Sequence, residues 1–126
     1  MSMLADIVMQ DREGVPVASV RGEVDVSNAD DLGRQLHGLV PISALGLVLD
    51  LTETTYFDSS GVRLLFDLGE RLGRRQQGLR VVVEEGSFLA DLLDTINFVV
   101  FAPVDGDVNE AIATIRRNAP DNAQRR

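Results

Sequence analysis

The sequence predicts a single α/β domain with a mixed β-sheet of four to five strands and about four α-helices, in the order β-β-α-β-α-β-α-β-α. Its 126 residues suffice for one hydrophobic core. Two short and almost uniformly apolar runs, at residues 45–51 and 79–83, are typical of parallel strands that are covered on both faces. Around these runs, apolar residues recur at spacings of three and four, which indicates amphipathic helices.

The first part of the chain predicts a hairpin and then a helix. Residues 6–10 and 15–20 resemble strands, and the turn between them ends at Gly14, which is free to take a positive φ. Asp25 or Ser27 can cap the helix that follows. We expect one buried stripe on this helix, made of Val26, Ala29, Leu32, Leu36 and Leu39.

The remaining elements follow in the same way. After the central strand at 45–51, residues 52–57 lead into a second helix over residues 59–75. We expect its inner face to consist of Val62, Leu65, Leu68, Gly69 and Leu72. A strand at 79–83, a short helix at 88–93 and a last strand at 98–101 come next, and Asp105 or Asp107 caps a final helix. The βα units should be parallel and right-handed, and the opening hairpin antiparallel.

The residue types present exclude most catalytic chemistry. The chain has no cysteine and no lysine, and His37 is its only histidine. Thiol catalysis, Schiff-base chemistry and zinc or iron sites are therefore excluded, and we expect no catalytic residue, no metal and no cofactor. We also expect a cytoplasmic protein without a membrane segment, because the sequence shows neither a signal peptide nor an apolar run of about 18 residues.

The charge is unevenly distributed. The chain carries a net charge of −8, and residues 1–115 hold 19 of the 20 acidic residues but only eight of the twelve arginines, a balance of −11. An acidic surface of this kind is repelled by phosphate backbones, so we expect no nucleic-acid partner. We expect the domain to span residues 1–117 and residues 118–126 to form a disordered tail, whose arginines make either a basic arm or a solvated terminus.

The sequence Asp58-Ser59-Ser60-Gly61 stands where the second helix begins, and two interpretations of it are open. In the first, Asp58 or Ser59 caps the helix by accepting from a backbone N–H, and Gly61 allows close backbone approach. In the second, a serine at the helix N-terminus is presented to a partner. A phosphoryl group added there would be held by free N–H groups and would change what docks, without unfolding the domain.

Two separated motifs resemble those of the STAS-domain anti-sigma factor antagonists. Gly22-Glu23-Val24-Asp25 resembles the family's G-E-L/I-D. Residues 47–51, followed by Tyr56 and Phe57 and then by Asp58-Ser59-Ser60-Gly61-Val62, resemble its V-L-D-L and D-S-S/T-G-L/V signature. The likeness extends over residues 5–115 and implies a single STAS-like domain.

The resemblance implies a function and a set of site residues. Ser59 is the implied phosphoacceptor, with Ser60 as the second choice. The implied partner is an anti-sigma factor serine kinase of the histidine-kinase-like ATPase fold, which the unphosphorylated antagonist binds so that a sigma factor is released. A PPM-type phosphatase restores the binding form, and ATP and magnesium belong to the kinase. The partner-binding residues implied here are Asp25, Asp58, Ser59, Ser60, Gly61 and Arg63.

Arg63 departs from the family pattern, in which a second glycine is common at this position. It can pair with the phosphate, pair with an acidic residue of the kinase, or be a solvated side chain. STAS domains also occur as scaffolds in stress-signalling complexes and as accessory subunits of lipid-transport systems. A STAS-type scaffold or accessory subunit without a phosphorylation switch is therefore the alternative function.

Overall fold

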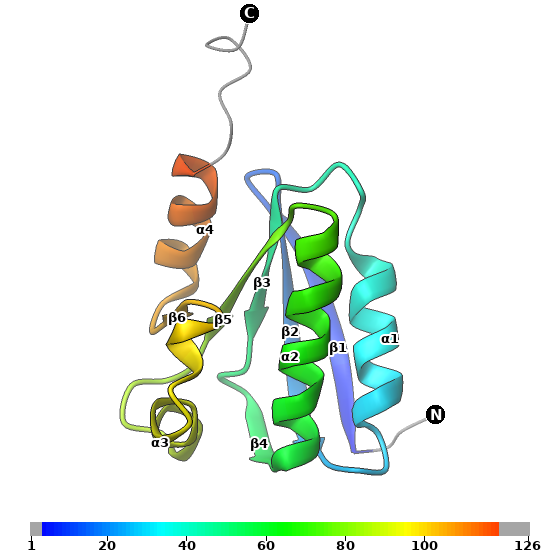
Figure 1. The fold of residues 1–126 in the computed structure, drawn as a ribbon, viewed down its shortest axis with the longest axis vertical. Helices are drawn as coiled ribbons and strands as arrows, with labels where there is room; N and C mark the ends of the chain where they lie inside the picture. The colour runs from blue at the N-terminus through cyan, green and yellow to red at the C-terminus, as the bar shows by residue number, and fades with distance from the viewer. Residues whose placement is uncertain (1–3, 119–126) are drawn as a thin grey trace, which may run out of the picture.

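A six-stranded β-sheet forms the centre of the computed structural model, which describes residues 4–118 (Figure 1). Most of the tail predicted from residue 118 lies outside these residues. Five strands are neighbours in the order β1 (Ala5–Arg12), β2 (Val15–Val24), β3 (Gly46–Asp50), β5 (Gly78–Val82) and β6 (Val104–Asp105). A further strand, β4 (Thr54–Phe57), pairs with the end of β2. Only β1 is antiparallel to its neighbour, so the mixed sheet is confirmed, with one strand more than predicted.

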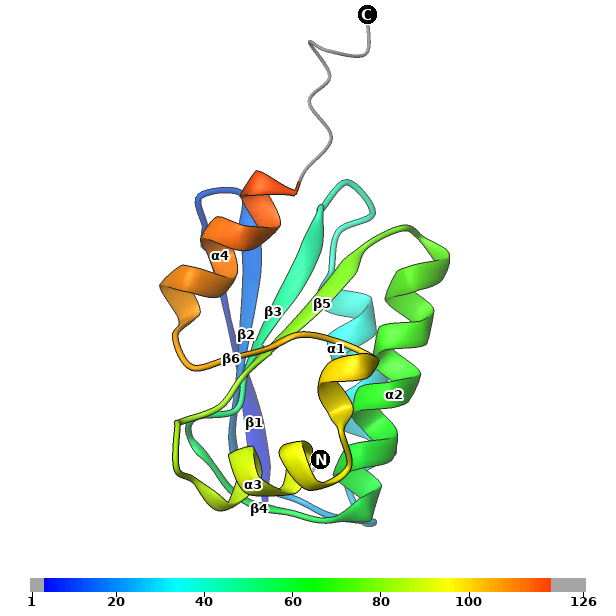
Figure 2. The same ribbon diagram turned by 60° about the vertical axis from the view of Figure 1, so that its left-hand side comes forward.

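The helices lie in two layers, one on each face of the sheet (Figure 2). Three helices pack on one face: α1 (Ala29–Leu39), α2 (Ser59–Arg74) and α3 (Phe88–Thr95). They bury the larger part of the core against the sheet. The last helix, α4 (Val108–Arg117), covers the other face, where Ala111, Ile112 and Ile115 pack on valines of β2, β3 and β5.

The opening hairpin has the predicted turn, but its strands are longer than predicted. Arg12 pairs with Val15, so only Glu13 and Gly14 form the loop, with φ values of 55° and 85°. Two successive residues with positive φ match the right-handed twist of the flanking strands, and such turns favour glycine. The Gly14 N–H also donates to the Asp11 side chain at 2.9 Å.

The predicted central strand and second helix are confirmed in position. Leu47, Val48 and Leu49 of β3 have no exposed surface, since helices cover both of its faces. On α2, the predicted Leu65, Leu68 and Leu72 are buried. Val62 and Gly69 are only partly buried, and Gly61 and Leu64 take their places in the core.

The buried stripe predicted for the first helix is wrong at both ends. Ala29, Leu32 and Leu36 are buried as expected. Val26, however, is 82% exposed, because it lies in the loop before α1, and Leu39 is 46% exposed at the last residue of the helix. The spacing of three and four continues beyond the helix itself, so it does not mark where the helix begins and ends.

Residues 52–57 contain the strand β4, which was predicted as a connection only. Its burial pattern runs buried, exposed, exposed, buried, without the alternation that identifies a half-buried strand. The strand forms because it pairs in parallel with β2 past an irregularity at Gly22. The buried Thr54 hydroxyl anchors it by donating to the Val20 carbonyl at 2.8 Å.

The strand predicted at residues 98–101 is also wrong. Phe98–Val100 form a 3₁₀ helix, and the last strand, β6, comes later. Asn97 takes a left-handed conformation that turns the chain, with φ of 58°. The rings of Phe98 and Phe101 then pack on Phe66 of α2, with centroids 5.2 and 4.6 Å from it. Aromatic packing against a helix therefore replaces strand pairing for this apolar run.

Candidate functional site

Asp58 begins α2 and sets its first turn. As the N-cap residue it has extended backbone, and its side chain accepts from the Ser60 N–H at 2.9 Å. Its own carbonyl accepts the first helical hydrogen bond, from Val62 at 3.1 Å. The predicted cap is confirmed, with Asp58 in place of the alternative Ser59. An uncapped N–H group would be costly here, so the aspartate fixes where the helix starts.

The two serines that follow have different environments. Ser59 is exposed at the first position of α2, whereas Ser60 is half-buried. Both stand at the positive end of the helix dipole, beside backbone N–H groups of the first turn. A partner approaching from solvent therefore reaches the Ser59 hydroxyl more readily than that of Ser60.

Gly61 is required by the packing beneath this turn. A Cβ atom at position 61 would lie 2.6 Å from ring atoms of Phe57, which is closer than any ordinary contact. Phe57, the last residue of β4, is itself only 5% exposed. The glycine thus lets the first turn of α2 rest directly on a core ring.

Parallel pairing of β2 with β4 brings the two sequence motifs to the same end of the sheet. Val24 pairs with Phe57, and Glu23 pairs with Tyr56. The motif residues after β2 and those after β4 therefore leave the sheet side by side. Figure 1 shows this end, where β4 and the first turns of α1 and α2 meet. Asp25, Asp58, Ser59, Ser60 and Gly61 are all brought to it.

Tyr56 links the acidic groups of this end. Its hydroxyl donates to Asp58 Oδ2 at 3.3 Å. The pKa of Tyr56 is raised, first by the negative charge of Asp58 and then by that hydrogen bond. Smaller contributions of the same sign come from Asp25 and Glu23. The surface next to Ser59 is therefore negatively charged.

Asp25 forms a tight turn in the loop between β2 and α1. Its Oδ1 accepts from the Ser27 hydroxyl at 2.6 Å and from the Ser27 N–H at 2.8 Å. These two bonds, the side-chain bond first, lower the pKa of Asp25 below its ordinary value. Neither Asp25 nor Ser27 is the N-cap of α1, which is Asn28. The predicted cap is thus wrong, because the loop uses these side chains for its own turn.

Asn28 holds this loop and was missed by sequence reasoning. Its side chain is buried, accepts from the Asp25 N–H at 2.9 Å and donates to the Glu23 carbonyl at 2.8 Å. The loop on which Asp25 sits is thereby attached to the end of β2. An asparagine three residues after Asp25 is as typical of a helix cap as of a loop hydrogen bond, so the sequence carries no separate signal for this role.

The backbone conformation at Gly22 requires a glycine at this position of the first motif. Its φ is 116°, a region that side chains other than glycine's rarely adopt, and a Cβ there would lie 2.1 Å from the Leu4 carbonyl oxygen. The Glu23 N–H donates to the same carbonyl at 2.8 Å. Gly22 therefore allows β2 to lie close to the Leu4 carbonyl at the point where its pairing with β4 becomes irregular.

Arg63 lies one turn into α2 from Ser59, with an exposed side chain. Within residues 4–118, no carboxylate forms an ion pair with it. Residues four apart share one face of a helix, so Arg63 and Ser59 are neighbours on the surface of α2. Exposed apolar side chains also occur at this end, with Val26 at 82% and Tyr56 at 46% exposed.

His37 lies at the other end of the helical layer. It is in the last turn of α1, and the Arg75 side chain donates to its carbonyl. Burial, then the positive charges of Arg75 and Arg71, lower the pKa of its imidazole. Among residues 4–118, no group of three or more His, Asp or Glu side chains could hold a metal ion. In the same range, no helix is long and apolar enough to cross a membrane.

Comparison with known proteins relates this chain to bacterial regulators. BtrV of Bordetella bronchiseptica, which is named as an anti-sigma factor antagonist, is 26% identical over 114 residues, or 90% of this chain and 97% of BtrV. The crystal structure of an anti-sigma factor antagonist from Mycobacterium paratuberculosis superposes with a TM-score of 0.79 at 26% identity, covering 89% of this chain and 94% of that one.

The fold is also that of SpoIIAA, an anti-sigma factor antagonist whose structure was determined in its unphosphorylated form. Its TM-score is 0.70 at 13% identity, and the superposition covers 91% of this chain and all of SpoIIAA. A model of the STAS domain matches residues 6–111, which include both motifs and the start of α2. The chain therefore belongs to the STAS domain family, whose members with this fold include anti-sigma factor antagonists.

Proposed function

We propose that this protein is an anti-sigma factor antagonist that binds an anti-sigma serine kinase, and that phosphorylation of Ser59 ends the binding. The observation that carries the proposal is the placement of Ser59. It is the exposed first residue of a capped helix, beside the loop that carries Asp25. Relatives that cover most of the chain and are named as antagonists support the same function.

The geometry explains how one modification could act without unfolding the domain. Asp58 caps the helix through the Ser60 N–H, and the cap does not use the Ser59 hydroxyl. A phosphoryl group on Ser59 adds a charge of about −1.5 to −2 at the positive end of the helix dipole. Its partner would meet this charge next to Asp58 and Asp25, so an acidic or apolar docking surface would be repelled.

Phosphorylation of the intact chain tests the proposal. The chain is incubated with ATP, magnesium and anti-sigma kinases of the histidine-kinase-like ATPase fold from the source organism. We expect one added phosphate by intact-mass spectrometry, located on Ser59 by fragmentation. Ser59→Ala should abolish it, and a PPM-type phosphatase should remove it from the wild-type chain.

Ser60→Ala is the matched control, because it removes the adjacent hydroxyl and leaves the Ser60 N–H that Asp58 requires. This variant should be phosphorylated at the wild-type rate. Equal labelling of Ser59→Ala and wild type would show that the assigned acceptor is wrong. Ser59→Asp should bind the kinase more weakly than wild type while its far-UV circular dichroism remains unchanged.

Arg63→Gln separates two roles for the arginine that follows Ser59 by one turn. If Arg63 contacts an acidic residue of the kinase, the variant binds the kinase more weakly before any phosphorylation. If it pairs with the phosphate, kinase binding is unchanged and the phosphate of modified Ser59 titrates at a higher pH in ³¹P NMR spectra. Unchanged values in both measurements would identify a solvated side chain.

A STAS-type scaffold or accessory subunit would give a different result. It would co-purify with signalling-complex or permease components, and the same proteins would be recovered with or without phosphatase treatment. An antagonist instead recovers a kinase only in its unphosphorylated form. No feature of residues 4–118 favours the scaffold over the antagonist.

A further inference from the structure

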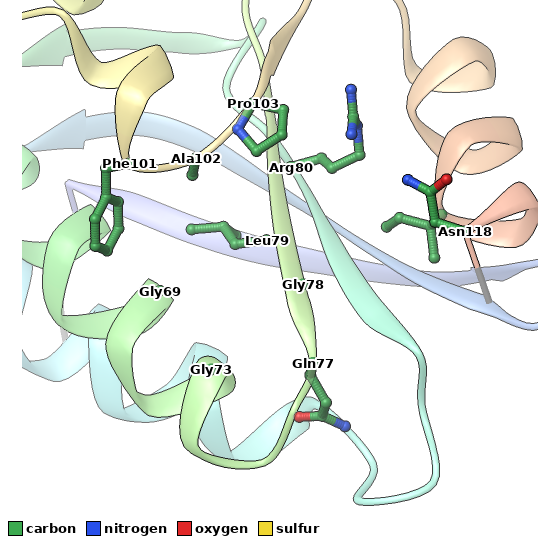
Figure 3. Close-up of a pocket in the computed structure, with 11 residues that line it drawn as sticks. Gly69, Gly73, Gln77, Gly78, Leu79, Arg80, Phe101, Ala102, Pro103 and Asn118 are labelled. Carbon is green, nitrogen blue, oxygen red and sulfur yellow. The ribbon is translucent and has the colours of Figure 1, made fainter. Parts of the chain in front are cut away.

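The row of strands from β1 to β6 ends in two edges that differ in length. At one edge β6 has only two residues, and Phe101, Ala102 and Pro103 line a cleft over the beginning of β5 (Figure 3). Proline has no N–H with which to pair another strand. At the other edge β1 has eight residues and, among the strands of residues 4–118, pairs with β2 alone. Short strands, proline, lysine and bulges protect edges in many proteins, and β1 has none of them.

The outer side of β1 carries backbone groups that no strand receives. The Leu4 carbonyl accepts from the Glu23 N–H at 2.8 Å, which shows that the even-numbered residues of this strand hydrogen-bond to β2. The N–H and C=O groups of the odd-numbered residues therefore point away from β2. They belong to Ala5, Ile7, Met9 and Asp11. Within the described part of the chain, no strand pairs with this side of β1.

The two faces of β1 have different neighbours. Ile7 and Met9 pack against the core that α1, α2 and α3 cover. Asp6 and Arg12 lie on the opposite face, because side chains alternate along a strand. The Arg12 side chain accordingly donates to Asn109 of α4. Core packing on one face and eight residue pairs with β2 hold the strand in place, so the edge exists before a partner arrives.

Opposite charges stand near the two ends of this strand, on the same face. Asp6 is exposed and Arg12 is half-buried, and within residues 4–118 neither side chain forms an ion pair. When two β1 strands pair antiparallel about a two-fold axis at Met9, each Asp6 stands opposite the Arg12 of the other copy. Met9 directs its backbone groups outwards, so it can form the central hydrogen-bonded pair with itself. Asp6 and Arg12 then fall in the closely spaced class of cross-strand pairs.

We propose that a second copy of this chain pairs with β1, antiparallel and centred on Met9, so that two sheets join into one. Each copy has a net charge of −8, and two copies therefore repel each other at long range. The two pairs of Asp6 with Arg12 supply local attraction at the edge itself. β4 pairs with β2 on the side opposite to β1, and the join uses no residue at the start of α2. The proposal thus goes beyond the phosphorylation of Ser59.

Other two-fold registers do not bring the opposite charges together. With the axis at Val8, Asp6 faces Gln10 of the other copy and Arg12 faces Leu4. With the axis at Ile7, Asp6 faces Val8. A strand of another protein makes both charged contacts only if it carries an aspartate and an arginine six residues apart. The antiparallel second copy supplies this pattern by symmetry.

Sedimentation equilibrium and amide hydrogen exchange of the intact chain test the proposal. We expect the apparent mass to rise from one copy towards two between about 10 μM and about 1 mM protein. Over the same range, hydrogen exchange at the Ile7 and Met9 N–H groups should slow by about threefold or more. Exchange at Val8 and Gln10 should stay unchanged, because these groups already bond to β2.

Two charge reversals form a matched set. Asp6→Arg places two arginines opposite each other across the join, and Arg12→Asp places two aspartates there. Each variant should weaken the association by at least about tenfold. The double variant restores opposite charges in exchanged positions and should associate more strongly than either single variant. Arg12→Asp also removes the bond to Asn109, whereas Asp6→Arg leaves that bond in place.

Glu85→Arg is the control for net charge. It makes the same change in charge at an exposed residue in the loop before α3. This variant should associate at least as strongly as wild type, since it reduces the overall repulsion without altering the edge. Ser59→Ala should associate like wild type, which keeps this test separate from the phosphorylation experiment.

Four results would overturn the proposal. The first is a single copy at every concentration up to about 1 mM. The second is an equal effect of Asp6→Arg and Glu85→Arg, which would make net charge the cause. The third is a double variant that associates as weakly as its two parents. The fourth is slow exchange at Ile7 and Met9 that does not depend on protein concentration, because the chain itself would then cover the edge.

Discussion

At the start of α2, helix capping and the proposed modification use different residues. Asp58 uses the backbone N–H of Ser60 to cap the helix, so the cap needs neither serine hydroxyl. Ser60 is half-buried, whereas Ser59 is exposed. A modification of Ser59 therefore leaves the structural bond intact. This separation is the physical basis for expecting a switch that changes binding and preserves the fold.

Removing the Asp58 cap should destabilise the domain to a limited extent. We expect Asp58→Ala to lower the free energy of unfolding by about 1 kcal/mol, because the Ser60 N–H loses its acceptor. Asp58→Asn keeps an acceptor oxygen at the same position and should stay close to wild type. Urea unfolding of the three proteins measures the difference. An equal loss in both variants would mean that charge, and not the hydrogen bond, stabilises this end of α2.

Gly61 and Gly38 should respond in opposite directions to the same substitution. Gly61→Ala brings a methyl group against the buried Phe57 ring and should cost about 1–3 kcal/mol of stability. Gly38→Ala has open space in α1 and should be neutral or stabilising by up to about 1 kcal/mol, since alanine favours the helix. Thermal unfolding of both variants compares them. A wild-type melting temperature for Gly61→Ala would show that Phe57 moves aside at no cost.

At the scale of elements, the loop between β2 and α1 is held from both sides. Asp25 closes its own turn through Ser27, and the buried Asn28 binds the backbone at Glu23 and Asp25. β4 runs parallel to β2 and brings α2 alongside. The proposed docking surface thus consists of one ordered loop and one helix start, both fixed to neighbouring strand ends.

The Asp25 turn should be sensitive to acid. Hydrogen bonds from Ser27 lower the pKa of Asp25 below its ordinary value of 3.8. The stabilisation that they provide is therefore complete above pH 3.8 and is lost as the pH falls through the lower pKa of the folded state. We expect Ser27→Ala to raise the pKa of Asp25 towards 3.8, as followed by ¹³C NMR of its carboxyl group. An unchanged titration curve would contradict the assigned cause.

At the scale of the whole molecule, β5 and β6 depend on the forked pair of Arg80 and Asp105. The two side chains are 17% and 8% exposed, so removing one partner leaves a charge with little access to water. We expect Arg80→Met to lower the free energy of unfolding by about 3–5 kcal/mol. Arg80→Met combined with Asp105→Asn should cost less than the single Arg80 variant. Denaturant unfolding of the double-mutant cycle measures this coupling, and additive losses would show that the pair is not coupled.

Long periodic segments were predictable because their burial depends on local sequence. The uniform apolar residues of β3, the helical spacing of Leu65, Leu68 and Leu72, and the turn at Gly14 all have one favourable local structure. The short segments were not predictable in this way. β4 forms because it pairs with β2, which is distant in the sequence. The conformation at Phe98 is set by the contact of its ring with Phe66 of α2.

The sequence by itself determined the α/β class, most helices and the turn Asp58-Ser59-Ser60-Gly61 at the start of α2. These depend on patterns and capping groups that act over a few residues. Only the tertiary structure decided that Asp25 lies beside Asp58, that Ser59 is more exposed than Ser60, and that residues 54–57 form a strand beside β2. Strand pairing and burial decide these points, and both join residues that are far apart in the chain.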